Sequence, residues 1–383
     1  MTIYILTFLS CLLLDRLPER QFQIIKWFFL IYLYGFLCFG YTVGSDWRNY
    51  ETMYESFSNE ELLNKDLERG FYFLIYISRL IISDFWLFLG IVKCIYFYSI
   101  IKFIRIFTNK IFTPIAFLLS YNLLFMLIDN PLRFMIGSIF ITLATIYLVN
   151  NRLIKFMLLS LLGVLFHVSL IVPILLSIFI LMRKKIVNAS NRTLILIYLI
   201  SCIFGFLPDI LNILSGIVAN YFPSLSNKLV NIYLAESNSA MFSIGSIVML
   251  VLFYLFIRFR SVLLKIQYGE ILFLFGLLFL YLSRILLVFP TGFRIPLYFG
   301  LFFVIGIVTI ARYSGLKMRL FLSVLIGLTI IKTILSTYPY IPYTNSIFYI
   351  LSGEHLPRSY REDLNKNNFY ERTGETVIEL YEN

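Results

Sequence analysis

Long apolar runs, separated by short polar or basic turns, fill most of this 383-residue chain. A helix needs about 20 apolar residues to cross the hydrocarbon core of a bilayer. Most of the runs approach this length, so the pattern predicts an all-α, polytopic transmembrane helix bundle of about 10–12 membrane segments. We expect these segments at 2–14, 22–41, 70–83, 85–107, 111–128, 134–149, 153–182, 194–213, 241–257, 271–289, 295–310 and 320–336.

Segment 153–182 is long for a single pass and is interrupted by Gly163, His167 and Pro173. Basic residues flank both of its ends, so we expect a helical hairpin that enters the membrane and returns. A single long pass is the alternative, and it would place the preceding basic turns outside. Segment 70–83 is too short to cross, and we expect it to pack as a half-helix at the outer face.

The composition is that of a membrane protein. Hydrophobic residues make up 60% of the chain and charged residues only 14%, whereas soluble domains carry about a quarter charged residues. We therefore expect a single transmembrane domain over residues 1–336, with an outward loop at 42–69. The polar tail at 337–383 is expected to lie outside as well.

The net charge of +11 does not point to nucleic acid as a partner, because the basic residues lie in turns between apolar runs. The positive-inside rule places these turns in the cytoplasm. The chain has only two histidines, and its four cysteines show no paired spacing. Neither a phosphate-binding glycine-rich loop nor an Asp-x-Asp motif in a loop is present. We therefore expect no metal site and no cofactor.

Ionisable residues at membrane depth cost roughly 3 kcal/mol each, which makes them functional candidates. In the expected topology Asp46, Arg133 and Arg294 share the outer face. Arg284 lies about 15 Å deeper than Arg294, at a rise of about 1.5 Å per helical residue. Because arginine gives planar, paired hydrogen bonds to phosphate oxygens, a cavity of arginines suits a lipid-linked phosphate or pyrophosphate.

These arginines also have structural explanations, and the sequence leaves both kinds open. Arg133 and Arg294 lie close to helix ends, where snorkelling to the headgroups accounts for a cation. Arg284 suits a structural pair with Asp209 or Glu270 equally well.

Five short motifs follow one another in order along the membrane region. They are Gly44-Ser-Asp46-Trp-Arg48-Asn-Tyr50, Glu68-Arg-Gly70-Phe71, Asp129-Asn-Pro-Leu-Arg133, Leu165-Phe166-His167-Val-Ser169-Leu170 and Phe293-Arg294-Ile-Pro-Leu-Tyr298-Phe299. Their order and spacing resemble the EpsG-type branch of the Wzy-like bacterial polysaccharide polymerases. The chain departs from the usual pattern around Arg133. Asn130-Pro131-Leu132 precedes this arginine where the family more often has glycine or isoleucine, and Phe134 follows it where glutamine is frequent.

The resemblance implies a metal-independent glycosyltransferase that polymerises O-antigen or capsule repeat units. Such an enzyme transfers a growing glycan from undecaprenyl pyrophosphate to the sugar end of another lipid-linked repeat unit. The reaction takes place at the outer, periplasmic face of the bacterial plasma membrane. The implied partners are the lipid-linked oligosaccharide, the bilayer and a chain-length regulator, with no nucleic acid.

For this chemistry we expect a base for the acceptor hydroxyl and cations for the departing pyrophosphate. Asp46 is the first choice for the base, although an ordinary loop acid explains it too. His167 is the second choice, with a satisfied histidine at a helix kink as its alternative, and Arg294 is expected at the leaving group. The expected substrate-binding residues are Arg48, Tyr50, Arg133 and Arg284.

Two other functions compete with the polymerase. A flippase for the same lipid-linked sugars should show two repeated halves and charges midway along several helices. The sequence shows no such repeat, and the candidate arginines cluster near one face. A ligase that attaches finished glycan to a different acceptor is not separated from a polymerase by the sequence.

Overall fold

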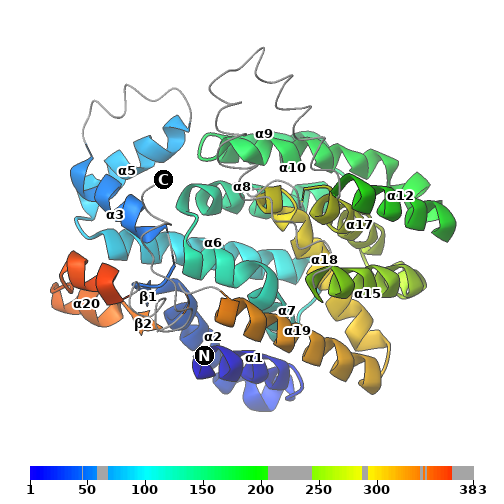
Figure 1. Ribbon diagram of the computed structural model, residues 1–383, viewed down its shortest axis with the longest axis horizontal. Helices are drawn as coiled ribbons and strands as arrows, with labels where there is room; N and C mark the ends of the chain where they lie inside the picture. The colour runs from blue at the N-terminus through cyan, green and yellow to red at the C-terminus, as the bar shows by residue number, and fades with distance from the viewer. Residues whose placement is uncertain are drawn as a thin grey trace. The chain divides into compact units, whose positions relative to one another are not determined.

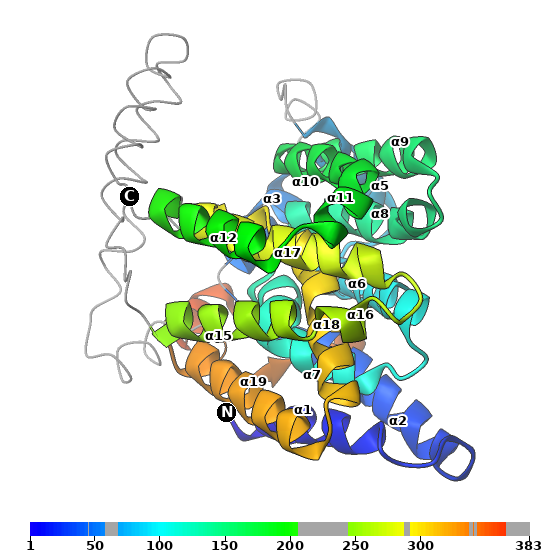
Figure 2. The same ribbon diagram turned by 90° about the vertical axis from the view of Figure 1, so that its right-hand side faces the viewer.

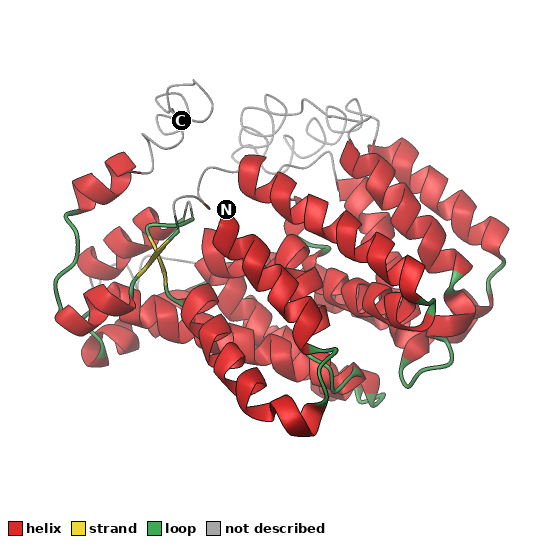
Figure 3. Ribbon diagram, turned by 90° about the horizontal axis from the view of Figure 1, so that it is seen from below, coloured by secondary structure: helices red, strands yellow, loops and turns green. Residues whose placement is uncertain are grey.

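The computed structural model describes residues 1–44, 46–57, 68–205, 244–286, 292–336, 340 and 343–364. Helices make up nearly all of this part of the chain (Figure 3). The two strands within it are β1 (Gly40–Tyr41) and β2 (Thr344–Asn345). The prediction of an all-α bundle is confirmed.

The chain divides into two compact units, one formed by Met1–Ile171 with Leu316–Asn383 and the other by Val172–Gly315. The first unit (Figure 1) contains α1 (Thr2–Leu14), α2 (Glu19–Cys38), α3 (Trp47–Ser56), α5 (Arg69–Ile81), α6 (Phe85–Phe107), α7 (Phe112–Leu118), the π-helix η1 (Leu119–Asp129), α8 (Leu132–Val149), α9 (Leu153–Val164), η2 (Val168–Leu170), α19 (Leu316–Ser336) and α20 (Ile347–Ser352). The second contains η3 (Ser177–Met182), α11 (Arg183–Asn188), α12 (Asn191–Gly205), α15 (Ile244–Arg258), α16 (Arg260–Leu263), α17 (Gly269–Ile285), η6 (Gly292–Arg294) and α18 (Leu297–Tyr313). The unit boundary falls in α10 (Ile171–Leu176).

Five of the described helical segments are long and apolar enough to cross a membrane. They are Gln21–Cys38, Phe85–Phe107, Phe112–Asp129, Leu132–Val149 and Leu316–Leu335. Shorter apolar helices occur at Thr2–Leu14, Leu153–Val164, Asn191–Ile203, Gly245–Arg258 and Leu297–Tyr313. The chain is therefore a polytopic membrane protein. In the second unit α17 and α18 pack against each other (Figure 2).

The apolar pattern predicts several helix ends residue for residue. α1 occupies the predicted segment 2–14, and α6 occupies 85–107. The start of α6 has a clear cause, because the Asp84 carboxylate accepts a hydrogen bond from the Leu87 N–H at 2.9 Å. Segment 153–182 breaks after α9, as its glycine, histidine and proline predict. The return of its second half as a hairpin stays a prediction.

The loop predicted at 42–69 contains a helix that the sequence did not predict. In α3 the side chains of Trp47, Glu51 and Tyr54 are buried on one face, at the spacing of successive helical turns. The tail folds back beside this helix, where β2 pairs with β1 in antiparallel register, Gly40 opposite Asn345. Figure 1 shows α3, the two strands and α20 gathered at one end of the first unit.

Two glycines let α8 and α9 approach each other closely. A β-carbon on Gly137 would lie 2.7 Å from the Gly163 carbonyl oxygen, and one on Gly163 would lie 2.5 Å from the Gly137 oxygen. Real β-carbons do not approach carbonyl oxygens so closely, so any larger residue would push these helices apart. This close approach sets the distance between the start of α8 and the end of α9.

We expect Gly163→Ala to lower the stability of the purified protein by about 1–3 kcal/mol, the usual cost of overpacking. Thermal unfolding in detergent measures the change. Gly35→Ala is the matched control, because a β-carbon there would meet only the Ile347 side chain at an ordinary 3.9 Å. Alanine in place of this helical glycine should be neutral or slightly stabilising. Equal melting temperatures for the two variants would contradict the close approach.

Candidate functional site

A carboxylate, a guanidinium and an imidazole meet in the first unit. Arg133 Nη1 donates a hydrogen bond to Glu68 Oε2 at 2.8 Å, and His167 Nδ1 lies 2.7 Å from Glu68 Oε1. The Val168 N–H donates to Oε1 at 3.3 Å. We call Glu68, Arg133 and His167 the acid–base cluster. Glu68 is 65 residues from Arg133 in the sequence and 99 from His167, so only the fold brings the three together.

The local sequence places Arg133 in the first turn of α8. Asn130 ends η1 with a left-handed backbone (φ 68°), a conformation that asparagine tolerates better than most residues. Pro131 then precedes α8, where its fixed φ suits a helix start. The buried Asn130 side chain donates from Nδ2 to the Val43 carbonyl oxygen at 3.0 Å, which fixes this turn against the chain that follows β1.

Glu68 reaches the cluster through a strained backbone at the start of α5. Its φ of 59° and ψ of 31° are left-handed, a conformation that costs an ordinary residue roughly 1–2 kcal/mol. The next turn is tied to the end of α9, because the Gly70 N–H donates to the Leu165 carbonyl oxygen at 3.0 Å. Such strain tends to occur at functional sites, where the surrounding structure compensates for it.

Aromatic rings surround the Arg133 guanidinium. Its central carbon lies 5.1 Å from the Phe71 ring centre, 5.5 Å from that of Tyr72 and 6.0 Å from that of Tyr50. The negative face of an aromatic ring attracts a cation at these distances. His167 in turn packs edge-to-face against Phe134 at 5.5 Å. The rings therefore fix the cation while one of its edges faces Glu68.

The environment keeps Glu68 ionised. Burial acts to raise the pKa of this carboxyl, but hydrogen bonds from His167 and Arg133 outweigh burial and lower the pKa from 4.5 to about 2. Because the pKa is lower in the folded state, the associated stabilisation is complete above about pH 4.5 and is lost as the pH falls toward about 2. So weakly basic a carboxylate is better suited to orient the imidazole than to take up a proton.

The predicted site residues of the first unit fall into two places. Arg133, His167 and Tyr50 meet at the acid–base cluster. Asp46 and Arg48 lie at the start of α3, where the Asp46 N–H donates to the Asp129 carbonyl oxygen at 3.4 Å. Arg48 is buried, with its guanidinium carbon 5.4 Å from the Trp47 ring centre.

Arg284 belongs to the second unit and ends in a polar contact within it. Its Nη1 donates to the Ser246 hydroxyl oxygen at 3.0 Å. Glu270, one of its two proposed structural partners, instead pairs with Arg183 at 3.3 Å. The other, Asp209, lies outside the described residues.

Arg294 also belongs to the second unit, where it is half-buried at the end of η6. The roles predicted for Arg284 and Arg294 stay predictions. As for metals, no group of three or more His, Cys, Asp or Glu side chains in the described ranges is arranged to hold an ion.

Sequence reasoning missed Glu68 as a site residue. The signal was present, because this acid stands directly before the helix α5, within one of the five motifs. It was not singled out because it counts as an ordinary acid of a polar loop until its two partners are placed beside it.

All of these residues fall within a stretch, residues 2–345, that matches the sequence model of one family, described as the EpsG family. The chain belongs to the EpsG family. Its membership confirms the resemblance inferred from the five motifs and indicates a polysaccharide polymerase-like function. No curated protein matches this EpsG-family chain. No solved structure matches it either.

Proposed function

We propose that this EpsG-family protein polymerises lipid-linked oligosaccharide repeat units, as a metal-independent glycosyltransferase. The observation that supports this most is the acid–base cluster, in which an ionised carboxylate holds a histidine beside an arginine. These are the groups that glycosyl transfer from a pyrophosphate needs: a base for the acceptor and a cation for the leaving group.

In the proposed reaction, His167 Nε2 takes the proton from a hydroxyl of the acceptor sugar. The hydroxyl oxygen forms a bond to the anomeric carbon of the donor glycan. The bond from that carbon to the pyrophosphate oxygen breaks, and undecaprenyl pyrophosphate leaves with the electron pair. Glu68 is a positioning residue here, since its bond to Nδ1 fixes the tautomer and stabilises the imidazolium that forms.

The remaining site residues receive substrate roles in this proposal. Arg133 lies close enough to the base to contact the pyrophosphate with the edge that does not face Glu68. Arg284 keeps the pyrophosphate-binding role expected from the sequence, and Arg294 keeps its proposed place at the leaving group. Tyr50 and Arg48 are proposed to contact the sugars. Asp46 becomes the second choice for the base, because the cluster already joins an imidazole to the carboxylate that orients it.

The proposed location is the bacterial plasma membrane, with the acid–base cluster facing the periplasm or exterior. The basic turns support this orientation, since the positive-inside rule keeps them in the cytoplasm. A chain-length regulator is the proposed protein partner. The alternatives are a flippase and a ligase for the same lipid-linked glycans, and an experiment must distinguish them from a polymerase.

Arg133→Lys provides that experiment, because it keeps the charge that Glu68 needs and removes the planar, paired donors. We expect shorter glycans with roughly ten-fold slower extension, since each lost electrostatic contact to a leaving group has an effect of at least this size. The measurement is the length distribution of surface glycan, together with the lipid-linked repeat units on each side of the membrane. Arg152→Lys, the same change at an exposed position beyond the far end of α8, is the matched control.

Each alternative predicts a different distribution. Shortened glycans at the surface of Arg133→Lys cells, with normal protein abundance, would support a polymerase. Lipid-linked units that collect inside the cell would support a flippase and contradict the proposal. Full-length glycan that stays attached to its lipid carrier would support a ligase instead.

A further inference from the structure

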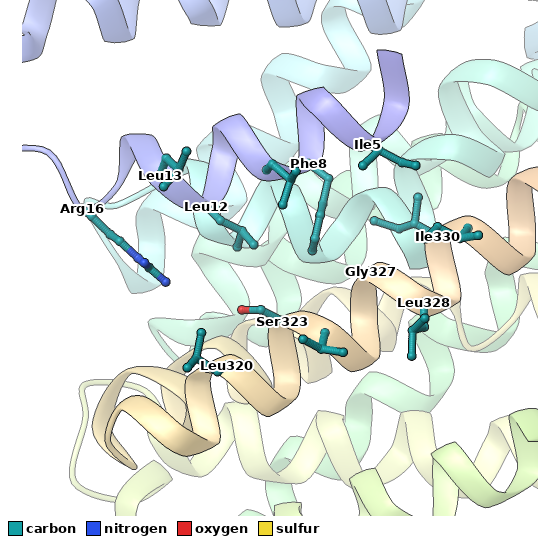
Figure 4. A pocket seen from close by; sticks show the side chains of 13 residues that line it. Ile5, Phe8, Leu12, Leu13, Arg16, Leu320, Ser323, Gly327, Leu328 and Ile330 are labelled. Atoms are coloured by element: carbon teal, nitrogen blue, oxygen red, sulfur yellow. The ribbon is translucent and has the colours of Figure 1, made fainter. Parts of the chain in front are cut away.

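An apolar groove runs between α1 and α19 in the first unit (Figure 4). Its volume is about 480 Å³, and its walls are formed by aliphatic side chains of both helices, among them Leu9, Leu13 and Val324. Phe8 points across from α1 to Gly327, where a β-carbon would lie 3.2 Å from the ring. The ring therefore forms the floor of the groove, and no larger residue than glycine fits there without a shift.

A basic cavity lies at the C-terminal end of α1. Its volume is about 610 Å³, and it is formed by the turn between α1 and α2, the first half of α2, and the end of α6 with the turn that follows it. Four cationic side chains line it, namely Arg16, Lys26, Arg105 and Lys110. Its single acid, Asp15, is already engaged, because its carboxylate accepts hydrogen bonds from the Phe112 and Thr113 N–H groups at 3.3 and 2.6 Å. The cavity therefore keeps an excess of positive charge.

Arg16 lines both spaces. In Figure 4 its side chain extends from the end of α1 toward the space between α1 and α19. Within the described ranges Arg16, Arg105 and Lys110 form no ion pair with an acid, and Lys26 donates only to the Leu17 carbonyl oxygen at 3.0 Å. An apolar groove that opens beside unpaired cations is complementary to a lipid with an anionic headgroup.

We propose that this groove and cavity together bind one anionic phospholipid of the bilayer. One acyl chain lies along the groove, and the phosphate lies in the cavity within reach of Arg16, Arg105 and Lys110. The site is separate from the acid–base cluster and does not depend on the glycan chemistry proposed above.

The length of the groove favours a phospholipid over a polyprenyl phosphate. From Ile5 to Leu13 the helix rises about 12 Å at about 1.5 Å per residue. One leaflet of the hydrocarbon core is about 15 Å deep. An acyl chain of one leaflet matches this distance, whereas a polyprenyl chain several times longer would extend well beyond the groove.

The test is lipid retention by the purified full-length protein in native mass spectrometry. The probes are phosphatidylglycerol, phosphatidylcholine with the same acyl chains, undecaprenyl phosphate and inorganic phosphate. We expect the unmodified protein to retain phosphatidylglycerol in preference to phosphatidylcholine. Arg16→Gln with Arg105→Gln should reduce that retention by roughly 10- to 30-fold, given the attraction of each basic side chain to an anionic headgroup.

The matched control is Lys184→Gln with Lys185→Gln, which removes the same charge at two exposed positions of α11. It should leave the retention unchanged, and equal losses in both double variants would overturn the site in favour of general surface charge. Val324→Trp fills the groove without a change of charge and should also release the lipid. Tighter retention of undecaprenyl phosphate than of phosphatidylglycerol would overturn the choice of occupant. If the protein retained inorganic phosphate as strongly as phosphatidylglycerol, the role of the acyl chain would be overturned.

Discussion

Glu68→Gln should slow glycan extension by roughly 10²- to 10⁴-fold, the usual contribution of a positioned acid–base group. The amide has nearly the shape of the carboxylate, so the backbone at the start of α5 stays as it is. It carries no charge, however, and it no longer stabilises the imidazolium of His167 or neutralises Arg133. The measurement is the rate of extension with purified lipid-linked repeat units, with glycan length in cells as the second readout.

Two companion variants show whether Glu68 acts through His167. His167→Asn keeps an N–H group near the position of Nδ1 but removes Nε2, so the bond to Glu68 can persist while the base is lost. If Glu68 acts through the imidazole, Glu68→Gln combined with His167→Asn should be no slower than His167→Asn alone. Glu55→Gln, at an exposed position of α3, is the matched control. Normal glycan length in Glu68→Gln cells at normal protein abundance would remove this residue from the mechanism.

Arg361→Ala should destabilise the protein by about 3–5 kcal/mol, the cost of leaving a buried charge without its partner. Arg361 comes from the tail, and its Nη1 lies 2.8 and 3.0 Å from the two carboxylate oxygens of Glu51 on α3. Both side chains are almost fully buried, at 6% and 2% exposure. The Trp86 indole N–H also donates to Glu51 at 2.9 Å, but this neutral donor does not compensate the charge of the carboxylate.

Thermal unfolding in detergent and limited proteolysis of the tail measure this effect. Glu51→Gln with Arg361→Met should recover most of the stability, because the amide still accepts from Trp86 and neither of the two positions then carries a buried charge. Arg358→Gln is the control. Its ion pair with Glu362 is partly exposed, and such pairs contribute at most about 1 kcal/mol. Equal melting temperatures for Arg361→Ala and Arg358→Gln would contradict a stabilising role for the buried pair.

The sequence predicted the membrane-spanning elements well because they follow from one local property, the length of an apolar run. It missed α3, whose buried face includes the charged residues Arg48 and Glu51 and so lacks an apolar stripe. The burial of Glu51 depends on Arg361, which lies 310 residues away. No pattern within the loop reveals a partner at that distance.

The candidate site was predicted only in part, because local sequence reveals some of its residues and not others. Arg133 and His167 stand out because a charge or a histidine is unusual at the edge of an apolar run. Glu68 does not, because its neighbours in the sequence are polar. Its role appears only when the end of α9 comes within hydrogen-bonding distance of the start of α5.

The pairing of β1 with β2 sets an order of events during synthesis. The Asn345 amide donates to the Gly35 carbonyl oxygen at 2.8 Å across 310 residues of sequence, so this contact can form only after residue 345 has left the ribosome. Until then the Glu51 carboxylate has no Arg361 to pair with, and β1 has no β2. Contacts between such distant segments form late and slowly. A chain that stalls before residue 345 would therefore leave β1 without its partner strand and Glu51 without Arg361.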